Sequence, residues 1–214
     1  GDSLNVRVLN LPFPDMLGAR NLGLREAEGD VVVFTDDDTL APPNWLERLL
    51  AHYRDPRVGA VGGPTFPGNS LNVPLDPRYK RLNKVTPWGA IVAKPYFDGR
   101  KPAEVDHLGG ANMSFRRRLV EGGFDTRLRW YWTRMGMDLC LRVKRLGYRV
   151  IYDPEAWVIH RPDTNSPAKA LYEGDMGAPH YWRILGGRVF NESYLLLKHS
   201  PNIGVALVRA LYQL

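Results

Sequence analysis

The chain has 214 residues, of which 44% are hydrophobic and 24% are charged, so it is long enough for one globular domain with a full core. Its single cysteine excludes a disulfide framework and a cysteine-based zinc cluster, which fits a reducing compartment. No stretch reaches the roughly 20 apolar residues that a transmembrane helix needs. The net charge of +6 favours anionic partners such as nucleotide phosphates, anionic lipids or nucleic acid. A solvated surface explains each basic cluster taken singly.

An acidic turn after an apolar strand is the most informative feature. The run from Val31 to Phe34 predicts a strand buried on both faces of a sheet, and Asp36, Asp37 and Asp38 follow it after one threonine. Adjacent carboxylates repel one another, so the arrangement favours a bound cation, and Mg²⁺ or Mn²⁺ prefers such oxygen ligands. In open α/β sheets, ligands bind beyond the carboxyl ends of the strands. The alternative is a solvated turn that caps the next helix.

The elements expected around this turn alternate between helix and strand, which is typical of α/β proteins. A first strand at 6–9 and a helix at 18–30 precede the turn, and a helix at 42–50 follows it. Further along we expect, in chain order, a strand at 58–63, an irregular segment at 64–102, a strand at 108–115, a short helix at 116–121, a helix at 137–146, strands at 148–152 and 156–159, and mostly helix from 167 onward. Cys140 lies on the apolar face of its helix and is predicted to be a core residue.

Four segments resemble family 2 glycosyltransferases of the GT-A fold. They read ARNLGLREAEGDVVVFTDDDTLAPPNWLERLL, HLGGANMSFRRRLVEGGFD, DLCLRVKRLGYRVIYDPEAWVIH and, more weakly, FNESYLLLKHSP, in the order of the family. The resemblance implies one α/β domain over residues 1–214, with a central, mixed but mostly parallel sheet flanked by helices and a helical carboxy-terminal part at 166–214. The family's opening strands, with a carboxylate that contacts the base, have no counterpart here, so we expect an amino-terminally shortened chain.

The resemblance also implies a nucleotide and metal site. Asp36 would meet the ribose or base, and Asp38 would bind the divalent ion, Mn²⁺ or Mg²⁺, that bridges the diphosphate. Arg20 is similar in position to an arginine that touches the nucleotide, although a surface charge on a helix is equally compatible with its sequence context. His160, at the end of a strand, would complete the metal shell. The alternative for His160 is a structural histidine.

A glycine loop is expected beside the donor sugar. Gly109, Gly110, Ala111 and Asn112 resemble the family's loop that forms a floor for the sugar and the acceptor, because glycine allows close backbone approach. Any turn can use a glycine pair, so these residues alone are a weak signal. Asp106 and His107, just before the loop, are within reach of the same pocket.

The expected catalytic base is the largest departure from the family. Inverting transfer needs a carboxylate that accepts the proton of the attacking hydroxyl. The family places an acidic pair before its DL…R helix, whereas this chain has Met135 and Gly136 there, and only Asp138 remains. Asp138 is therefore the candidate base, with a helix cap as the alternative. If no carboxylate acts as base, the protein is a catalytically impaired remnant that binds nucleotide or a partner without turnover.

The predicted function is transfer of a sugar from a nucleotide-diphosphate donor to a hydroxyl acceptor, either a glycan or a lipid-linked molecule. The segments 194–199 and 205–211 are amphipathic and basic, so they suit either peripheral contact with an anionic membrane or packing against the domain. We expect a cytoplasmic protein, with the inner face of the membrane as one location. Nucleic acid is not an expected partner, because no recognised binding motif accompanies the charge.

Overall fold

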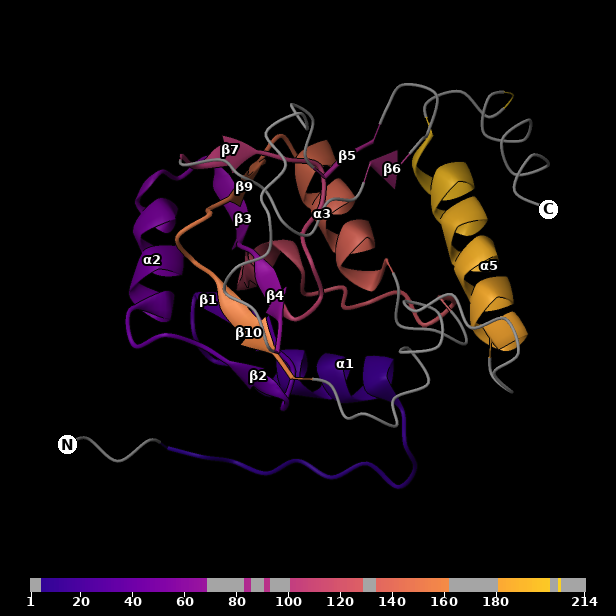
Figure 1. The fold of residues 1–214 in the computed structure, drawn as a ribbon, viewed down its shortest axis with the longest axis horizontal. Coiled ribbons are helices and arrows are strands. Elements are labelled where there is room, and N and C mark those ends of the chain that lie inside the picture. Colours follow the sequence, from indigo (N-terminus) through magenta and orange to yellow (C-terminus); the bar gives the residue numbers. More distant parts are fainter. Residues whose placement is uncertain are drawn as a thin grey trace.

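The computed structural model describes residues 5–68, 83–85, 91–92, 101–128, 134–161, 181–200 and 204. Most of the irregular segment expected at 64–102, and residues 166–180 and 205–211 of the expected helical part, lie outside this range. Figure 1 shows the elements, which in chain order are α1 (Met16–Glu26), β1 (Val31–Thr35), β2 (Thr39–Leu40), α2 (Trp45–Ala51), the 3₁₀ turn η1 (His52–Arg54), β3 (Val58–Gly62), β4 (Thr65–Pro67), β5 (Lys84–Val85), β6 (Ile91–Val92), β7 (Ala103–Glu104), β8 (Asn112–Arg116), the 3₁₀ turn η2 (Arg117–Leu119), α3 (Met135–Arg145), β9 (Arg149–Tyr152), β10 (Val158–His160) and α5 (Tyr181–His199).

A mixed five-stranded sheet forms the centre, in the order β1-β8-β3-β9-β7. The predicted strands at 31–34 and 108–115 are neighbours, because β1 pairs with β8 and sets Thr35 opposite Asn112. The mixed sheet flanked by helices is confirmed. Its pairing is less parallel than expected: among the described strands of this sheet only β3 and β9 are parallel neighbours. The reason is that β8 lies antiparallel between β1 and β3, and β7 lies antiparallel beside β9.

A smaller sheet, β2-β10-β4, was not predicted, and it matters most for the site. β10 pairs antiparallel with β2 and parallel with β4. The first pairing sets His160 opposite Thr39, directly after the acidic turn. A strand of two or three residues leaves little periodic signal in a sequence. This short sheet nevertheless brings His160 next to the residues that follow the acidic turn.

Helices cover both faces of the five-stranded sheet (Figure 1). On one face, Trp45 and Leu49 of α2 pack with Val58, Val61 and Ile151. On the other face, α3 contributes its apolar side, including the buried Cys140 that was predicted to be a core residue, and α5 lies outside α3. Among the described helices, none has the length and apolar character required to cross a bilayer.

Several predicted boundaries differ from the structure. The strand expected at 6–9 is wrong: residues 5–11 have no regular structure, and Val6 and Val8 are largely exposed because no described strand pairs with them. β8 begins at Asn112, since residues 108–111 form a turn in which the Asn112 amide donates to the Gly109 carbonyl. The short helix expected at 116–121 is the 3₁₀ turn η2, and α1 ends at Glu26, four residues before the expected end.

Candidate functional site

Three side chains that can bind a metal lie together beyond the carboxyl end of β1. Asp36 and Asp38 follow β1, and His160 ends β10. His160 Nε2 lies 3.2 Å from Asp38 Oδ1 and 3.9 Å from Asp36 Oδ2. One ligand atom of each residue lies within 4.8 Å of the others, and each side chain is about one-third exposed. Two carboxylates and an imidazole therefore face one shared point that solvent can reach.

Polar atoms without hydrogen-bond partners mark the same place. Asp38 Oδ1, Thr39 Oγ1 and Thr65 Oγ1 are buried and find no hydrogen-bond partner within the described part of the chain. The approach of His160 Nε2 to Asp38 Oδ1 is close, but it is not a hydrogen bond. Buried polar atoms usually have partners, and a divalent cation with a phosphate-bearing ligand would satisfy these. The group therefore fits a metal such as Mn²⁺ or Mg²⁺.

Arg20 of α1 connects the acidic turn to the glycine loop. Its Nη2 donates to Asp36 Oδ1 at 2.5 Å, and its Nη1 donates to the Gly110 carbonyl at 3.3 Å. The guanidinium lies 5.9 Å from the ring centroid of Phe124, and the side chain is only 12% exposed. Arg20 is thus not a free surface charge. Because it occupies Asp36 Oδ1, the other oxygen, Oδ2, is the one that faces His160.

The glycine loop lies beside this group. Gly109 is exposed and Gly110 is half-buried. Among the described residues, a Cβ atom at Gly109 would come within 4 Å of Thr65 Oγ1 alone, at 3.8 Å. The loop therefore leaves space next to the acidic turn, to which Arg20 ties it. The structure brings Asp36, Asp38, Gly109 and Gly110 to one edge, whereas Ala111 is buried behind them.

Asn112 has a different place from the one expected for a sugar contact. Its side chain is fully buried, donates to the carbonyls of Pro64 and Ala156 at 3.0 and 2.7 Å, and accepts from Trp45 Nε1 at 3.1 Å. The amide group of Asn112 is therefore engaged inside the fold, where it joins the segments that contain Trp45, Pro64 and Ala156. This role of Trp45 was not predicted from the sequence, although a buried tryptophan usually needs an acceptor for its indole N–H.

Asp106 and His107 do not join the metal group in the structure. Asp106 accepts hydrogen bonds from Lys144 Nζ at 2.6 Å and from the Val85 amide at 2.8 Å. Burial raises the pKa of Asp106, but the hydrogen bonds and the charge of Lys144 outweigh burial and lower it. His107 is buried in the segment before the loop. Asp106 therefore supports the edge of the sheet, and its neighbour His107 lies inside the fold.

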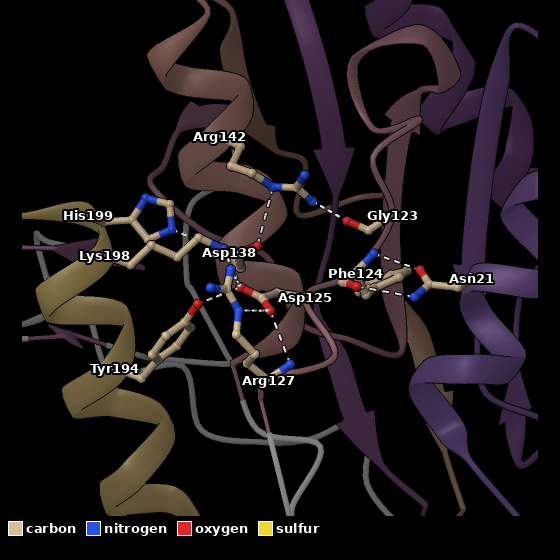
Figure 2. A network of polar contacts seen from close by, with 10 residues as sticks. All are labelled: Asn21, Gly123, Phe124, Asp125, Arg127, Asp138, Arg142, Tyr194, Lys198 and His199. Carbon is tan, nitrogen blue, oxygen red and sulfur yellow. Dashed lines mark hydrogen bonds and ion pairs between the residues drawn. The ribbon is translucent and has the colours of Figure 1, made fainter.

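Asp138 is buried in a separate cluster of charges, shown in Figure 2. Its carboxylate lies 2.7 Å from Lys198 Nζ, 2.7 Å from His199 Nε2 and 3.2 Å from Arg142 Nε. Burial raises the pKa of Asp138, but the hydrogen bonds from His199 and Lys198 and the neighbouring charges lower it overall. The side chain is 1% exposed and holds α3 to α5. Its Oδ2 has no hydrogen-bond partner in the described chain, but this oxygen is buried and faces Arg142 rather than solvent.

The positions of the two missing acids are closed in this structure. Met135 and Gly136 are both buried at the start of α3. A Cβ atom at Gly136 would lie 2.7 Å from Met113 Sδ and 3.4 Å from the Leu108 carbonyl oxygen. A carboxylate at position 136 would thus require the buried Met113 side chain to move.

The sequence itself decides the family. The model of the glycosyl transferase family 2 matches residues 2–124, more than half of the chain. The chain belongs to glycosyl transferase family 2. The GT-A fold of this family 2 member is also confirmed, by its likeness to the crystal structure of GalNAc-T7 with UDP, GalNAc and Mn²⁺: the TM-score is 0.50, over 87% of this chain and 44% of that chain. At 11% identity, this likeness shows the fold alone.

Two curated relatives of this family 2 glycosyltransferase differ in the molecules that their names mention. It is 32% identical to the glucosyl-dolichyl phosphate glucuronosyltransferase of Haloferax volcanii over 155 residues, which are 67% of this chain and 46% of the relative. It is 29% identical to the pre-mycofactocin glycosyltransferase of Mycobacterium tuberculosis over 187 residues, which are 84% of this chain and 38% of the relative. The chain spans less than half the length of both relatives.

Proposed function

We propose that this family 2 glycosyltransferase moves a sugar from a nucleotide-diphosphate donor to a hydroxyl acceptor, depends on a divalent metal, and inverts the anomeric carbon. The observation that carries the proposal is the group formed by Asp36, Asp38 and His160, with its unpaired carboxylate oxygen, beside Arg20 and the glycine loop. Carboxylates and one imidazole suit Mn²⁺ or Mg²⁺ held against a diphosphate.

Each side chain has a proposed role in binding the donor. Asp38 and His160 would hold the metal, which would supply positive charge to offset the charge of the leaving diphosphate. Asp36 contacts the ribose or base through its free oxygen, and Arg20 orients it. Gly109 and Gly110 let the donor sugar approach the backbone, while the buried Ala111 and Asn112 fix the loop from behind.

The transfer step needs a proton acceptor. The acceptor hydroxyl oxygen bonds to the anomeric carbon, the bond from that carbon to the diphosphate oxygen breaks, and the hydroxyl proton passes to a base. Asp138 is the acid that stands nearest in sequence to the expected base, but its burial and its contacts with Lys198, His199 and Arg142 favour an anchoring role. Binding of the nucleotide sugar without efficient transfer is therefore the second candidate function. The space closed by Met113 at Gly136 favours that alternative.

The acceptor is proposed from chemistry and from relatives. A hydroxyl on a glycan or on a lipid-linked molecule fits the reaction, and the name of the Haloferax volcanii relative includes a dolichyl phosphate. We therefore include peripheral contact with a membrane from the cytoplasmic side in the proposal.

Calorimetry tests the donor site. GDP and UDP are each titrated into the protein with Mn²⁺ and, separately, with a chelator. We expect Mn²⁺ to strengthen binding of at least one nucleotide and Asp38→Asn to abolish this enhancement. Asp37→Asn is the matched control, because Asp37 is exposed in the same turn and lies outside the metal group. Equal affinity with and without Mn²⁺ for both nucleotides would contradict a metal-dependent donor site.

Turnover is tested separately with Asp138→Asn. A base lost from the reaction lowers the transfer rate by about 10²- to 10⁴-fold with little change in nucleotide affinity, whereas loss of an anchor lowers the melting temperature. No transfer by the wild type, together with metal-dependent nucleotide binding, would support the binding-only alternative.

A further inference from the structure

The outward side of α5 carries a stripe of exposed apolar side chains that no described helix or strand covers. Trp182, Phe190 and Leu197 are 66%, 46% and 38% exposed. At 3.6 residues per turn, these three side chains lie within an arc of about 80° on the helix. The opposite side of α5 supplies buried residues such as Ile184 and Leu195. α5 is therefore packed on one face and apolar on the other, and exposed apolar patches of this kind usually mark a binding surface.

Three exposed cations lie beside this stripe. Arg183 follows Trp182 on α5 and is exposed. Arg127 is 67% exposed, with its guanidinium 5.4 Å from the ring centroid of Tyr194, which stacks on Phe190. At the end of the helix, the exposed Arg145 donates to the Lys198 carbonyl. The neighbourhood of the stripe is thus basic near both ends of α5.

The acids that α5 carries or is shown to contact all lie on the inward side. Glu192, the one acid of this helix, is 14% exposed and pairs with Arg134 at 2.8 Å and Arg188 at 3.1 Å. Asp125 and Asp138 are 8% and 1% exposed and pair with Lys198 (Figure 2). Asp125 also pairs with Arg127 at 2.9 Å. Within the described part of the chain no acid pairs with the exposed Arg183 or Arg145, so these two residues leave the outward face with positive charge.

We propose that this face of α5 is a membrane-contact surface for an anionic lipid bilayer. Trp182, Phe190 and Leu197 enter the boundary between headgroups and acyl chains, and the nearby exposed arginines contact lipid phosphates. The proposal deepens the proposed function, because the donor site would then be held near lipid-linked acceptors. The lipid contact itself depends on α5 alone.

A bilayer fits this face better than a second copy of the chain. Two copies joined through α5 would bring their exposed arginines together, and like charges oppose that contact. An anionic lipid surface complements the same arginines, and each basic residue near it contributes about 1 kcal/mol. Aromatic residues on one side of a basic helix are typical of helices that lie in the interface.

The test is co-sedimentation of the whole chain with vesicles of phosphatidylcholine, with and without phosphatidylglycerol. We expect binding to the anionic vesicles that weakens as salt is raised. The double variant Trp182→Ser, Phe190→Ser should bind at least about tenfold less without a change in melting temperature, because both side chains face outward. Phe13→Ser is the matched control, since Phe13 is 63% exposed in the amino-terminal segment and should leave binding intact.

Three outcomes would overturn the proposal: no preference for anionic vesicles, equal loss in the Phe13 control, or a dimer in gel filtration that the double variant abolishes. The last outcome would assign the stripe to a second copy. Asp38→Asn separates this proposal from the donor site, because it should lose metal-dependent nucleotide binding and keep vesicle binding.

Discussion

Two clusters of carboxylates in this protein differ in how their charge is met. Asp36 and Asp38 stand at the end of β1, about one-third exposed, with a buried oxygen that has no hydrogen-bond partner in the described chain. Asp125 and Asp138 lie under α5, almost fully buried, with Lys198 reaching both. In the first cluster Arg20 pairs with Asp36, and no arginine or lysine of the described chain pairs with Asp38. In the second cluster Lys198 pairs with both carboxylates, and Arg127 and Arg142 add further ion pairs.

This difference separates a binding site from a structural one. A buried carboxylate with cationic partners is costly to disturb, because removing one partner leaves uncompensated charge. A partly exposed pair of carboxylates with an open approach is available to a metal and its ligand. The candidate metal site was easier to predict from the sequence, because Asp36 and Asp38 stand in one acidic turn. The role of Asp138 was harder to predict, because its partners, such as His199, are distant in sequence.

The largest expected effect comes from breaking the buried cluster. Asp138→Ala should destabilise the protein by about 3–5 kcal/mol, because Lys198, His199 and Arg142 lose their shared carboxylate. Urea unfolding measures this change. Asp37→Ala is the control and should stay within about 0.5 kcal/mol, since Asp37 is exposed. If Asp138→Ala lowers the free energy of unfolding no more than Asp37→Ala does, the buried cluster does not stabilise the fold.

Acid should weaken the same cluster with a smaller effect. Burial raises the pKa of Asp125, but hydrogen bonds from Arg127, Lys198 and Tyr194 outweigh it, and the pKa values of Asp125 and Asp138 are both lowered in the folded protein. Their stabilisation is therefore complete above the unfolded pKa of about 3.9 and is lost as pH falls through the folded values. Unfolding free energy measured from pH 8 downward should be nearly level to about pH 5 and then decrease. If the unfolding free energy of Asp138→Asn decreases with acid as much as that of the wild type, protonation of Asp138 does not contribute to the decrease.

Removing the clamp on the acidic turn should have a moderate effect. Arg20→Gln releases Asp36 Oδ1 and the Gly110 carbonyl, and a lost hydrogen bond to a charged group costs about 1.5–3 kcal/mol. We expect metal-dependent nucleotide binding to weaken by about 10- to 100-fold in calorimetry. Arg25→Gln, at an exposed position on the same helix, is the control. If both variants bind alike, Arg20 does not organise the site.

The smallest expected effect concerns Thr65. Its buried hydroxyl has no hydrogen-bond partner in the described chain and faces the space at Gly109. Thr65→Val keeps the shape and should leave stability within about 0.5 kcal/mol, while nucleotide-sugar affinity falls by up to about tenfold if the hydroxyl meets the ligand. Unchanged affinity would place the ligand elsewhere on the loop.

The parts of the fold that sequence predicted well are those with a local pattern. Val31 to Phe34 form a strand because they are apolar and mostly β-branched, and this strand pairs with β8. It was expected to be buried on both faces, but only Val32 and Phe34 are buried, because β1 stands at the end of the described five-stranded sheet. The strand expected at 6–9 has a similar apolar pattern but no described partner, so its side chains remain exposed. Pattern alone therefore identifies strands only where a partner also exists.

The sequence predicted the residues of the candidate metal site but not the strands and hydrogen bonds that hold them in place. Asp36, Asp38 and His160 meet as the resemblance implied, although their roles stay proposals. The β2-β10-β4 sheet that brings them together was missed. The strand expected at 156–159 corresponds to β10, but its partners β2 and β4 are too short for a periodic signal. The bond between Trp45 and Asn112 joins residues far apart in sequence, and nothing local in either segment indicates it.

The separation of the two proposed metal ligands along the chain has a consequence for folding. Asp38 and His160 are roughly 120 residues apart, so their meeting requires a long loop to close, and such contacts form slowly. During synthesis, a ribosome-bound chain that already displays the whole acidic turn still lacks the imidazole. Capture of an ion by Asp38 and His160 together would then be a late event in folding, and metal uptake would report that β10 has joined β2.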